Sequence, residues 1–523
     1  MGNIKNMKKN HLGTVISFAA SLLLIACNGN TKSTEDSENP LRFKILSDST
    51  VEISGLNQNL DTVIIPNKAK IDGKEYNVVS IGNGAFENRN IKNVVISSGI
   101  TKIDDAAFAL CTELASIEIP SSVTSIGAYA FGDCKNLTNI ELPPNITEIG
   151  EITFKNCCKL TSIKIPSGVT SIGTNAFFKC TELTELEIPS SVTEIGDGVF
   201  AGCSNMKNIS IDPNNAYYST ENGVLYNKSK NTLICVPGGI KGDFEIPSNV
   251  DSIEYAAFLG CEELTDIKIH SGVSYIGWAA FADCNSLSSI KIPKGITYIG
   301  DGMFAGCKGL TDVDIPSSVM YIGEQAFKDC CELTDIKLPN NITSINHATF
   351  YGCKKLTNIN IPSNVTKIGS GAFVGCENLN SITIPSSVNE IGSYAFSSCG
   401  LKKIQIPSSI SQISNRAFQE CSSLESVELP STITCIEDGA FSNCRNLVFI
   451  ELPLGISVIG DMAFAGCNNL TYIKVPNSIE KIGRGAFYDC RKLEGIIQKA
   501  KDKIEVGDRA FIGCKSMKYV YKK

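Results

Sequence analysis

The chain has 523 residues, of which 43% are hydrophobic and 19% are charged, and its formal net charge is −7. The acidic balance argues against a nucleic-acid-binding protein, which needs a basic surface. Three histidines in a chain of this length provide little material for acid–base catalysis near neutral pH. We therefore expect no nucleic-acid partner, no cofactor and no enzymatic activity.

Residues 1–26 have the pattern of an export signal peptide. A short positive segment precedes an apolar run, residues 15–26, that is too short to span a bilayer, since a spanning helix needs about 20 apolar residues. The run ends in Leu24-Ile25-Ala26-Cys27, which resembles the lipobox of bacterial lipoproteins. The resemblance implies that Cys27 becomes the first mature residue and carries a lipid. An ordinary cleaved signal peptide with an incidental cysteine is the alternative.

Two further segments precede the regular part of the chain. Residues 27–40 comprise the lipid-attachment cysteine and a polar stretch that is typical of a flexible tether. Residues 41–75 contain three strand-like runs but no repeat signature. We interpret them as a β-rich N-terminal cap, because the open end of a repeat stack exposes apolar surface.

One motif then recurs eighteen times. Its centre is Ala-Phe-x-x-Cys, with most copies 23 residues apart. The phenylalanines are Phe86, Phe108, Phe131, Phe154, Phe177, Phe200, Phe258, Phe281, Phe304, Phe327, Phe350, Phe373, Phe396, Phe418, Phe441, Phe464, Phe487 and Phe511. All but Phe86 have Cys three residues later. A fixed period of this length indicates a repeat architecture.

Each part of the unit has a structural interpretation, which the copy at residues 160–182 illustrates. The stretch around Ile163 alternates as a half-buried strand does, and Pro166 ends it because proline cannot donate to a ladder. A second short apolar stretch, residues 169–172, leads into a turn. Residues 176–180 are expected to fill the interior from a short helical or 3₁₀ arc.

The turn after the second stretch has glycine in thirteen of the eighteen copies. The others have Asp, Glu, Asn or Ser, so the turn does not require a positive φ.

No single unit can bury its own apolar residues, whereas stacked units bury them continuously. The sequence therefore predicts a repeat solenoid, mainly β, curved and elongated, with one continuous core and roughly 80 Å of ladder. The unit matches the leucine-rich repeat class and resembles the BspA-like (treponemal-type) leucine-rich repeat surface lipoprotein family. That resemblance implies adhesion to host matrix or to other bacteria.

The repeats divide into two blocks and an end. Residues 76–203 and 244–493 are regular leucine-rich repeats, and residues 204–243 fit an inserted β-hairpin that serves as a spacer or as a functional element. Residues 494–523 are looser, as expected of a C-terminal capping repeat.

The cysteines form a column with one member per repeat. A line of thiols about 4.8 Å apart cannot enclose a metal ion, so we expect no metal site. The spacing and an exported location would permit disulfides, but cysteine also packs well as a small apolar residue. We expect mostly free, buried thiols, with Cys158 and Cys331 more exposed because each follows a column cysteine directly.

The polar residues that flank the inward isoleucines of the first strand are expected to face the concave side. Most form a mixed-charge, solvated surface. The last repeats differ, because aromatic residues lie beside charges there, as in protein-binding surfaces. The candidate partner-binding residues are Phe449, Glu451, Tyr472, Lys474, Tyr519 and Tyr521. His270 and His347 lie several repeats apart and cannot share one site.

Together these patterns favour an exported protein, lipid-anchored to the bacterial envelope and exposed at the outer membrane. It would present an extended surface to host or bacterial surface proteins. A scaffold lipoprotein facing the periplasm is the first alternative, and a glycan-binding accessory protein that uses the late aromatic residues is the second.

Overall fold

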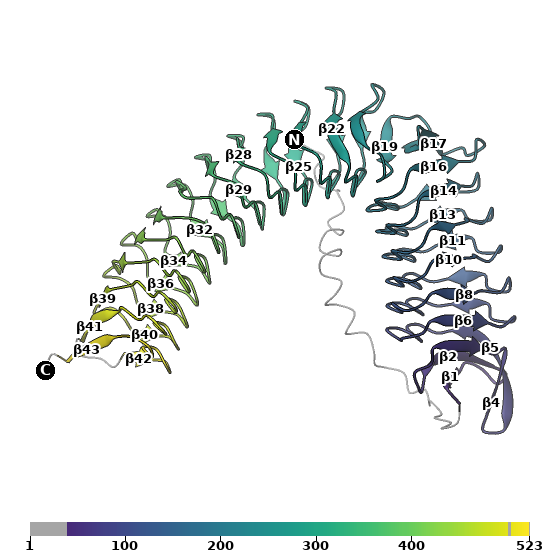
Figure 1. Cartoon of the computed structure of the whole chain (residues 1–523), viewed down its shortest axis with the longest axis horizontal. Helices are drawn as coiled ribbons and strands as arrows, with labels where there is room; N and C mark the ends of the chain where they lie inside the picture. The colour runs from purple at the N-terminus through teal and green to yellow at the C-terminus, as the bar shows by residue number, and fades with distance from the viewer. Residues whose placement is uncertain (1–38, 500–503, 522–523) are drawn as a thin grey trace.

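The structure, a computed structural model, describes residues 39–499 and 504–521. It is a β-solenoid of about 19 turns of roughly 23 residues, which confirms the predicted repeat architecture. Figure 1 shows the turns stacked into an open arc with two arms. The residues expected to form the signal peptide and most of the tether, including Cys27, lie outside the described part.

Each regular turn contributes to two ladders of parallel strands. The first ladder comprises β3 (Thr62–Ile65), β6 (Asn93–Ile96), β8 (Ser116–Glu118), β10 (Asn139–Ile140), β12 (Ser162–Ile163), β14 (Glu185–Ile188), β16 (Asn208–Ile211), β20 (Gly242–Glu245), β22 (Leu264–Lys268), β24 (Ser289–Lys291), β26 (Asp312–Asp314), β28 (Asp335–Ile336), β30 (Asn358–Ile359), β33 (Lys403–Gln405), β35 (Ser426–Glu428), β37 (Phe449–Ile450), β39 (Tyr472–Val475), β41 (Glu494–Lys499) and β43 (Ser516–Tyr521).

The second ladder follows the proline turn. It comprises β5 (Lys74–Ile81), β7 (Lys102–Ile103), β9 (Ser125–Ile126), β11 (Glu148–Ile149), β13 (Ser171–Ile172), β15 (Glu194–Ile195), β19 (Thr232–Cys235), β21 (Ser252–Ile253), β23 (Tyr275–Ile276), β25 (Tyr298–Ile299), β27 (Tyr321–Ile322), β29 (Ser344–Ile345), β31 (Lys367–Ile368), β32 (Glu390–Ile391), β34 (Gln412–Ile413), β36 (Cys435–Ile436), β38 (Val458–Ile459), β40 (Lys481–Ile482) and β42 (Glu505–Val506).

The N-terminal end of the stack is closed by strands that are not part of the repeat. β1 (Leu41–Ile45) pairs antiparallel with β2 (Thr50–Leu56), and β2 pairs parallel with β5. β4 (Lys68–Ile71) folds back antiparallel onto β5. These pairings cover the first edge of the second ladder, which would otherwise present open hydrogen-bonding groups.

The core is built around a column of phenylalanine rings. Successive rings lie 5.0–5.7 Å apart between centroids, and most pairs are nearly parallel. The rings are buried except for the last, Phe511, which is partly buried. Phe327, for example, is covered by Phe304 and Phe350 in the neighbouring turns. Stacked aromatic pairs add about 0.5–1.5 kcal/mol beyond their buried area.

The Ala-Phe-x-x-Cys segment is not the expected helical or 3₁₀ arc. No helix occurs in residues 39–499 and 504–521; the segment is a run of turns. Two residues per copy have left-handed backbone, for example Tyr129 (φ 56°) and Asp133 (φ 61°) on either side of Phe131. Left-handed residues cannot continue a right-handed helix, so the helical expectation was wrong.

Hydrogen bonds run from each turn to the next through this segment. Phe108 N–H donates to the carbonyl of Ala130 in the following turn at 2.8 Å. The Phe108 carbonyl in turn accepts the thiol of Cys134 at 3.2 Å. The same thiol-to-carbonyl contact recurs along the column, for instance from Cys330 to Phe304 at 3.1 Å. The recurrent cysteine therefore satisfies a buried carbonyl as well as filling space.

The recurrent glycine of the Ile-Gly turn is explained by close approach between turns. Gly173 does not have a positive φ, as the sequence indicated. A Cβ added there would lie 2.6 Å from the backbone nitrogen of Glu151 in the preceding turn.

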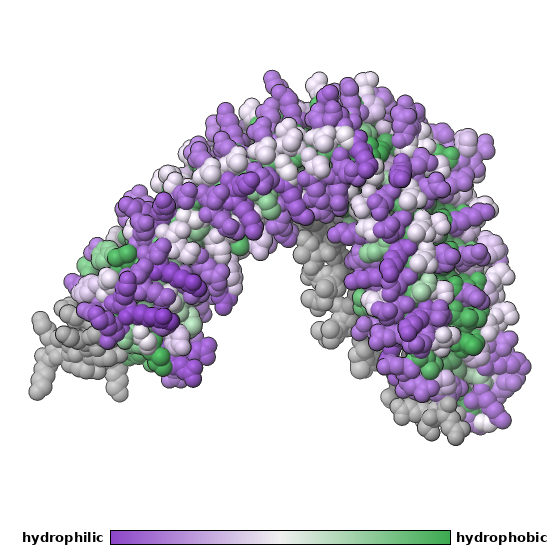
Figure 2. Space-filling view, in the orientation of Figure 1, coloured by the Kyte–Doolittle hydropathy of each residue, from purple (hydrophilic) through white to green (hydrophobic). Residues whose placement is uncertain are grey.

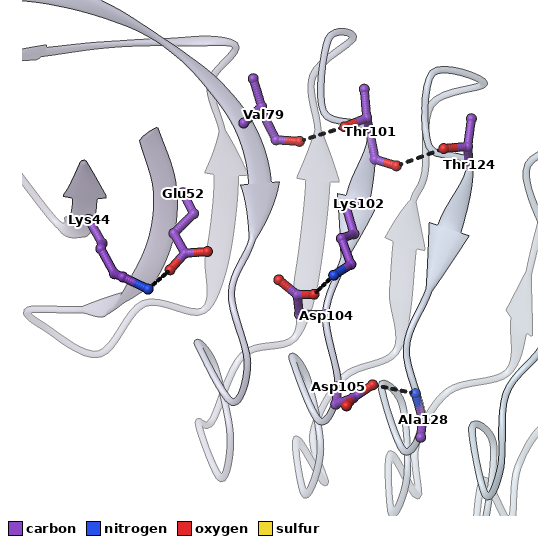
Figure 3. Close-up of polar contacts among 9 residues, drawn as sticks. All are labelled: Lys44, Glu52, Val79, Thr101, Lys102, Asp104, Asp105, Thr124 and Ala128. Atoms are coloured by element: carbon purple, nitrogen blue, oxygen red, sulfur yellow. Dashed lines mark hydrogen bonds and ion pairs between the residues drawn. The ribbon is translucent and has the colours of Figure 1, made fainter. Parts of the chain in front are cut away.

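Threonine and charged side chains add a second set of contacts between turns, shown in Figure 3 for the first repeats. Thr101 Oγ1 donates to the carbonyl of Val79 at 3.1 Å, and Thr124 Oγ1 to that of Thr101 at 3.3 Å. Ala128 N–H donates to the Asp105 carboxylate at 2.8 Å. The Thr of the consensus is thus selected by a hydrogen bond rather than by burial.

Residues 204–243 interrupt this pattern near the top of the arc (Figure 1). β17 (Tyr218–Glu221) and β18 (Val224–Asn227) form an antiparallel pair, and β18 pairs antiparallel with β19. β19 then joins the second ladder by pairing in parallel with β21. The segment is therefore a three-stranded meander whose last strand acts as a turn of the solenoid.

The insertion divides the hydrophobic core, so the expected single continuous core is wrong. One buried cluster runs from the cap to the insertion, and a second runs from the insertion to Ala510. They meet at β18, where Leu225 belongs to the first cluster and Val224 and Tyr226 to the second. The aromatic packing also changes here, since Phe258 meets Phe244 edge-on with 5.3 Å between ring centroids.

We predict that Phe327→Ala strongly destabilises the protein, because it removes one ring from the middle of the stack and leaves a cavity. The expected loss is about 3–5 kcal/mol in the free energy of unfolding, measured by urea denaturation followed by circular dichroism. The exposed Asp335→Ala is the control and should change it by less than about 0.5 kcal/mol. Equal effects of the two substitutions would contradict the stacking account.

The cysteines that the structure describes are all free thiols, and the column members are buried except Cys514, which is half-buried. Burial raises the pKa of Cys111 to about 11 and that of Cys467 to about 12. Cys158 and Cys331 are only half-buried, which confirms their expected difference from the column.

Iodoacetamide at about pH 8 should therefore modify Cys158 and Cys331 first, because only a thiolate reacts and the column thiols are both shielded and protonated. Peptide mass spectrometry of the native protein measures this order, and the same reaction in urea should modify every cysteine. Early labelling of Cys330 in the native protein would contradict the buried column.

Candidate binding surfaces

Phe449 and Tyr472 form an exposed aromatic pair on the first ladder. They are register partners on the neighbouring parallel strands β37 and β39. The inward residues Ile450 and Ile473 anchor these strands in the core, so strand alternation directs Phe449 and Tyr472 outward. The two side chains are 50% and 41% exposed. Parallel strands lie about 4.8 Å apart, so the two residues are direct neighbours on adjacent strands.

Charged residues border this pair. Glu451 and Lys474 are exposed, and each follows its aromatic residue by two positions. Alternation therefore places each on the same face as the aromatic residue before it. The structure brings these four predicted residues together in two adjacent turns, with aromatic area beside charges of both signs.

Two apolar neighbours of this pair were not identified from the sequence. Val448 precedes Phe449, and Leu454 lies in the proline turn that follows with 83% of its surface exposed. Most repeats have Ser, Asn or Lys at the Leu454 position. That departure from the repeat was the signal that could have revealed it. Figure 2 shows a hydrophobic area on the outer side of the C-terminal arm.

The expected concave placement of the first-ladder residues is wrong. Figure 1 places β28, β39, β41 and β43 of the first ladder toward the outer side of the arc, and β29, β34, β36, β40 and β42 of the second ladder toward its inside. The Phe449–Tyr472 pair therefore lies on the outer part of the C-terminal arm. Periodicity shows which residues share a face but not toward which face the stack bends.

Tyr519 and Tyr521 do not continue the aromatic column. Tyr472 pairs with Glu494, and Glu494 pairs with Ser516. Tyr519 is paired instead with Ile497, three positions further along β43. Eight residues separate Phe464 from Tyr472, but only five separate Phe511 from Ser516, and this shortening shifted the alignment made from the sequence. The side chains of these two tyrosines lie outside the described part.

A second aromatic surface, on the second ladder, was missed entirely. Tyr275, Tyr298 and Tyr321 lie on β23, β25 and β27 in three successive turns. The rings of Tyr275 and Tyr298 are 6.3 Å apart at an angle of 60°, and Tyr298 Oη donates to the carbonyl of Ile276 at 3.1 Å. The signal was the run of three Tyr-Ile-Gly tripeptides, which was read only as strand and turn.

The histidines occupy separate structural positions. His270 fills the slot of the strand-ending proline, where one ring nitrogen lies 3.0 Å from the Pro247 carbonyl and the other accepts Gly272 N–H at 3.1 Å. His347 is exposed in another turn. Among the described residues, no group of three Cys, His, Asp or Glu side chains is placed to hold a metal ion. The same residues include no helix able to span a membrane.

Comparisons with known proteins agree with this architecture. A leucine-rich cell surface protein from Faecalibacterium prausnitzii is 30% identical, with a TM-score of 0.54 over 64% of this chain and 95% of that one. The pneumococcal vaccine antigen PcpA has the same fold at 21% identity, with a TM-score of 0.53 over 69% of this chain and 94% of that one. Among curated proteins, no sequence matches significantly.

The family model for a BspA-type leucine-rich repeat region, which spans six copies, matches residues 57–157, 147–243, 240–357, 343–458 and 434–522. These matches overlap and together cover the whole solenoid. The chain belongs to the BspA-type leucine-rich repeat family.

Proposed function

We propose that the protein is a lipid-anchored bacterial surface protein that binds other proteins through its solenoid and mediates adhesion to host matrix or to other cells. The observation that carries this proposal is the exposed Phe449–Tyr472 pair on a rigid ladder. Large aromatic side chains held in fixed positions are the residues that contribute most at protein interfaces.

The position of the pair suits this role. A lipid on Cys27 would attach the cap end of the solenoid to the membrane. The Phe449–Tyr472 pair lies in the other arm, far along the stack from β1 (Figure 1). An anchor at one end and an aromatic surface near the other would hold the binding residues away from the membrane.

Two further observations support an exposed location. Residues 28–40 are polar and typical of a tether between an anchor and a folded domain. The F. prausnitzii relative, 30% identical, is described as a leucine-rich cell surface protein.

Protease shaving of intact cells tests the orientation. We expect trypsin to remove the full-length protein while a periplasmic control protein stays intact. Protection of the chain until the outer membrane is opened would contradict the surface location and favour a periplasmic scaffold.

Binding is tested with cells that display the Phe449→Ala, Tyr472→Ala double variant. We expect attachment of these cells to surfaces coated with decellularised host matrix to fall by roughly 30-fold or more, since each interface aromatic contributes about 1–2 kcal/mol or more. Tyr217→Ala, at another exposed tyrosine in the insertion, is the matched control and should leave attachment unchanged.

Equal attachment of the double variant and wild type, at equal surface levels, would exclude this aromatic pair as the binding site. Loss of attachment after glycosidase treatment of the matrix would instead favour the glycan-binding alternative.

A further inference from the structure

The inner side of the arc carries a surface that differs from the rest of the second ladder. We define the acidic aromatic surface by Tyr275, Tyr298, Tyr321, Glu254, Asp301 and Glu324, which lie on four successive turns after the insertion. β25, in the middle of it, lies toward the inside of the arc near its top (Figure 1). It is distinct from the Phe449–Tyr472 pair, which lies on the other ladder.

The tyrosines are held rigidly rather than packed into the core. Tyr298 and Tyr321 are direct register partners, and Tyr275 follows Ser252 in the same column. The isoleucine after each tyrosine is buried and anchors its strand, while the tyrosines remain half-buried or exposed. Most other turns have Ser, Glu or Lys at this position, so the fold does not require an aromatic residue there.

The charged side chains within the segments that carry these tyrosines are all negative. The corresponding segments of five successive regular turns, 193–200, 251–258, 274–281, 297–304 and 320–327, contain six carboxylates and no Lys or Arg. The nearest lysines along the chain are Lys294, exposed in the proline turn before Tyr298, and Lys328, which lies over the Tyr351 ring. The lysines of the insertion already have partners. Lys228 donates to the Asn215 carbonyl, and Lys230 pairs with Glu221 at 2.7 Å.

Elsewhere on the second ladder, several carboxylates pair with lysines. Lys367 pairs with Glu390 in the next turn at 2.8 Å, and Lys102 pairs with Asp104 at 2.5 Å. On the first ladder, an open groove of about 280 Å³ beside the insertion also contains its own pair, Lys291 with Asp314 at 3.0 Å. Within the described part, the acidic aromatic surface has no such ion pair.

Partial burial raises the free energy of the charged form of these carboxylates, which have no ion-pair partner. Burial, with a smaller contribution from Asp197, raises the pKa of Glu254 above its usual range. Burial also raises the pKa of Asp301, although Asp301 accepts Glu324 N–H at 2.8 Å. Burial and the Asp301 carboxylate together raise the pKa of Tyr321 to about 12. A cation placed here would relieve the repulsion and the lost hydration.

We propose that the acidic aromatic surface binds an extended segment of a partner polypeptide that carries lysine or arginine side chains. Carboxylates supply charge complementarity, and tyrosine faces supply cation–π contacts. Glu254 and Glu324 are separated by three turns, or roughly 14 Å, which an extended segment of about five residues spans. The 60° tilt between Tyr275 and Tyr298 leaves no flat double platform for a sugar ring.

The protein contains its own reporter for this test. Trp278 is the only tryptophan of the chain and lies on the turn between Glu254 and Asp301. It is half-buried, so we expect its emission to change when a ligand covers the neighbouring tyrosines. The probes are three synthetic octapeptides that alternate serine with lysine, with glutamate or with glutamine.

We expect the lysine peptide to change Trp278 emission saturably, and the glutamate and glutamine peptides to have no effect. Glu254→Gln with Asp301→Asn should weaken binding of the lysine peptide at least about 10-fold, since each removes a charge without removing the side chain. Tyr298→Ser, which installs the residue found at Ser252 and Ser344, should weaken binding as well. Glu148→Gln, on the same ladder but distant, should not.

Other outcomes overturn the proposal. Binding of the glutamine peptide as tightly as the lysine peptide would remove the electrostatic basis. A saturable response to chitotetraose or maltotetraose, without one to the lysine peptide, would assign the surface to sugars. No response to any probe at about 50 mM salt, where ionic attraction is weakly screened, would reject a binding role. Matrix attachment through Phe449 and Tyr472 is unaffected by these results, so the two proposals fail separately.

Discussion

The structure depends on one constraint, which is that every buried group in a turn is covered by its counterpart in the next turn. Phe327 is buried because Phe304 and Phe350 lie on either side of it. The carbonyl of Phe304 is satisfied because Cys330 donates its thiol from the next turn. No turn completes its own core or its own hydrogen bonds. The inward residues are therefore restricted in the same way in every copy, whereas the outward residues are free to vary.

That division explains where binding residues can occur. On the first ladder the outward position is Ser, Asp or Asn in most turns and becomes aromatic at Phe449 and Tyr472. On the second ladder it becomes tyrosine in three consecutive turns near the insertion. In both places the inward isoleucines are unchanged, so the aromatic residues sit on a scaffold that already holds them in register. Function can be added to such a fold without a change in its core.

The repeat spacing in the sequence was enough to predict which side chains face the core. Phe327 and Cys330 were assigned to the core because they recur at a fixed spacing. Of the two left-handed positions around Phe131, that of Asp133 is Gly, Asp or Asn in most copies, a signal that was not used, whereas that of Tyr129 varies widely and hid the shape of the turn. The direction of curvature was equally hidden, since it depends on small differences in packing between the two edges of each turn. Tyr298 was overlooked because only the first strand was examined for exposed residues.

The dependence of each turn on its two neighbours has a consequence for how such a gene can change. In-frame gain or loss of one repeat's worth of coding sequence leaves a complete stack on both sides of the junction, because the incoming phenylalanine meets rings of the same kind. Repeats that differ by one residue from the usual length also stack. For example, 22 residues separate Phe396 from Phe418, and their ring centroids still lie 5.4 Å apart. Recombination between repeats can therefore lengthen or shorten the reach of the molecule while the two aromatic surfaces keep their local geometry.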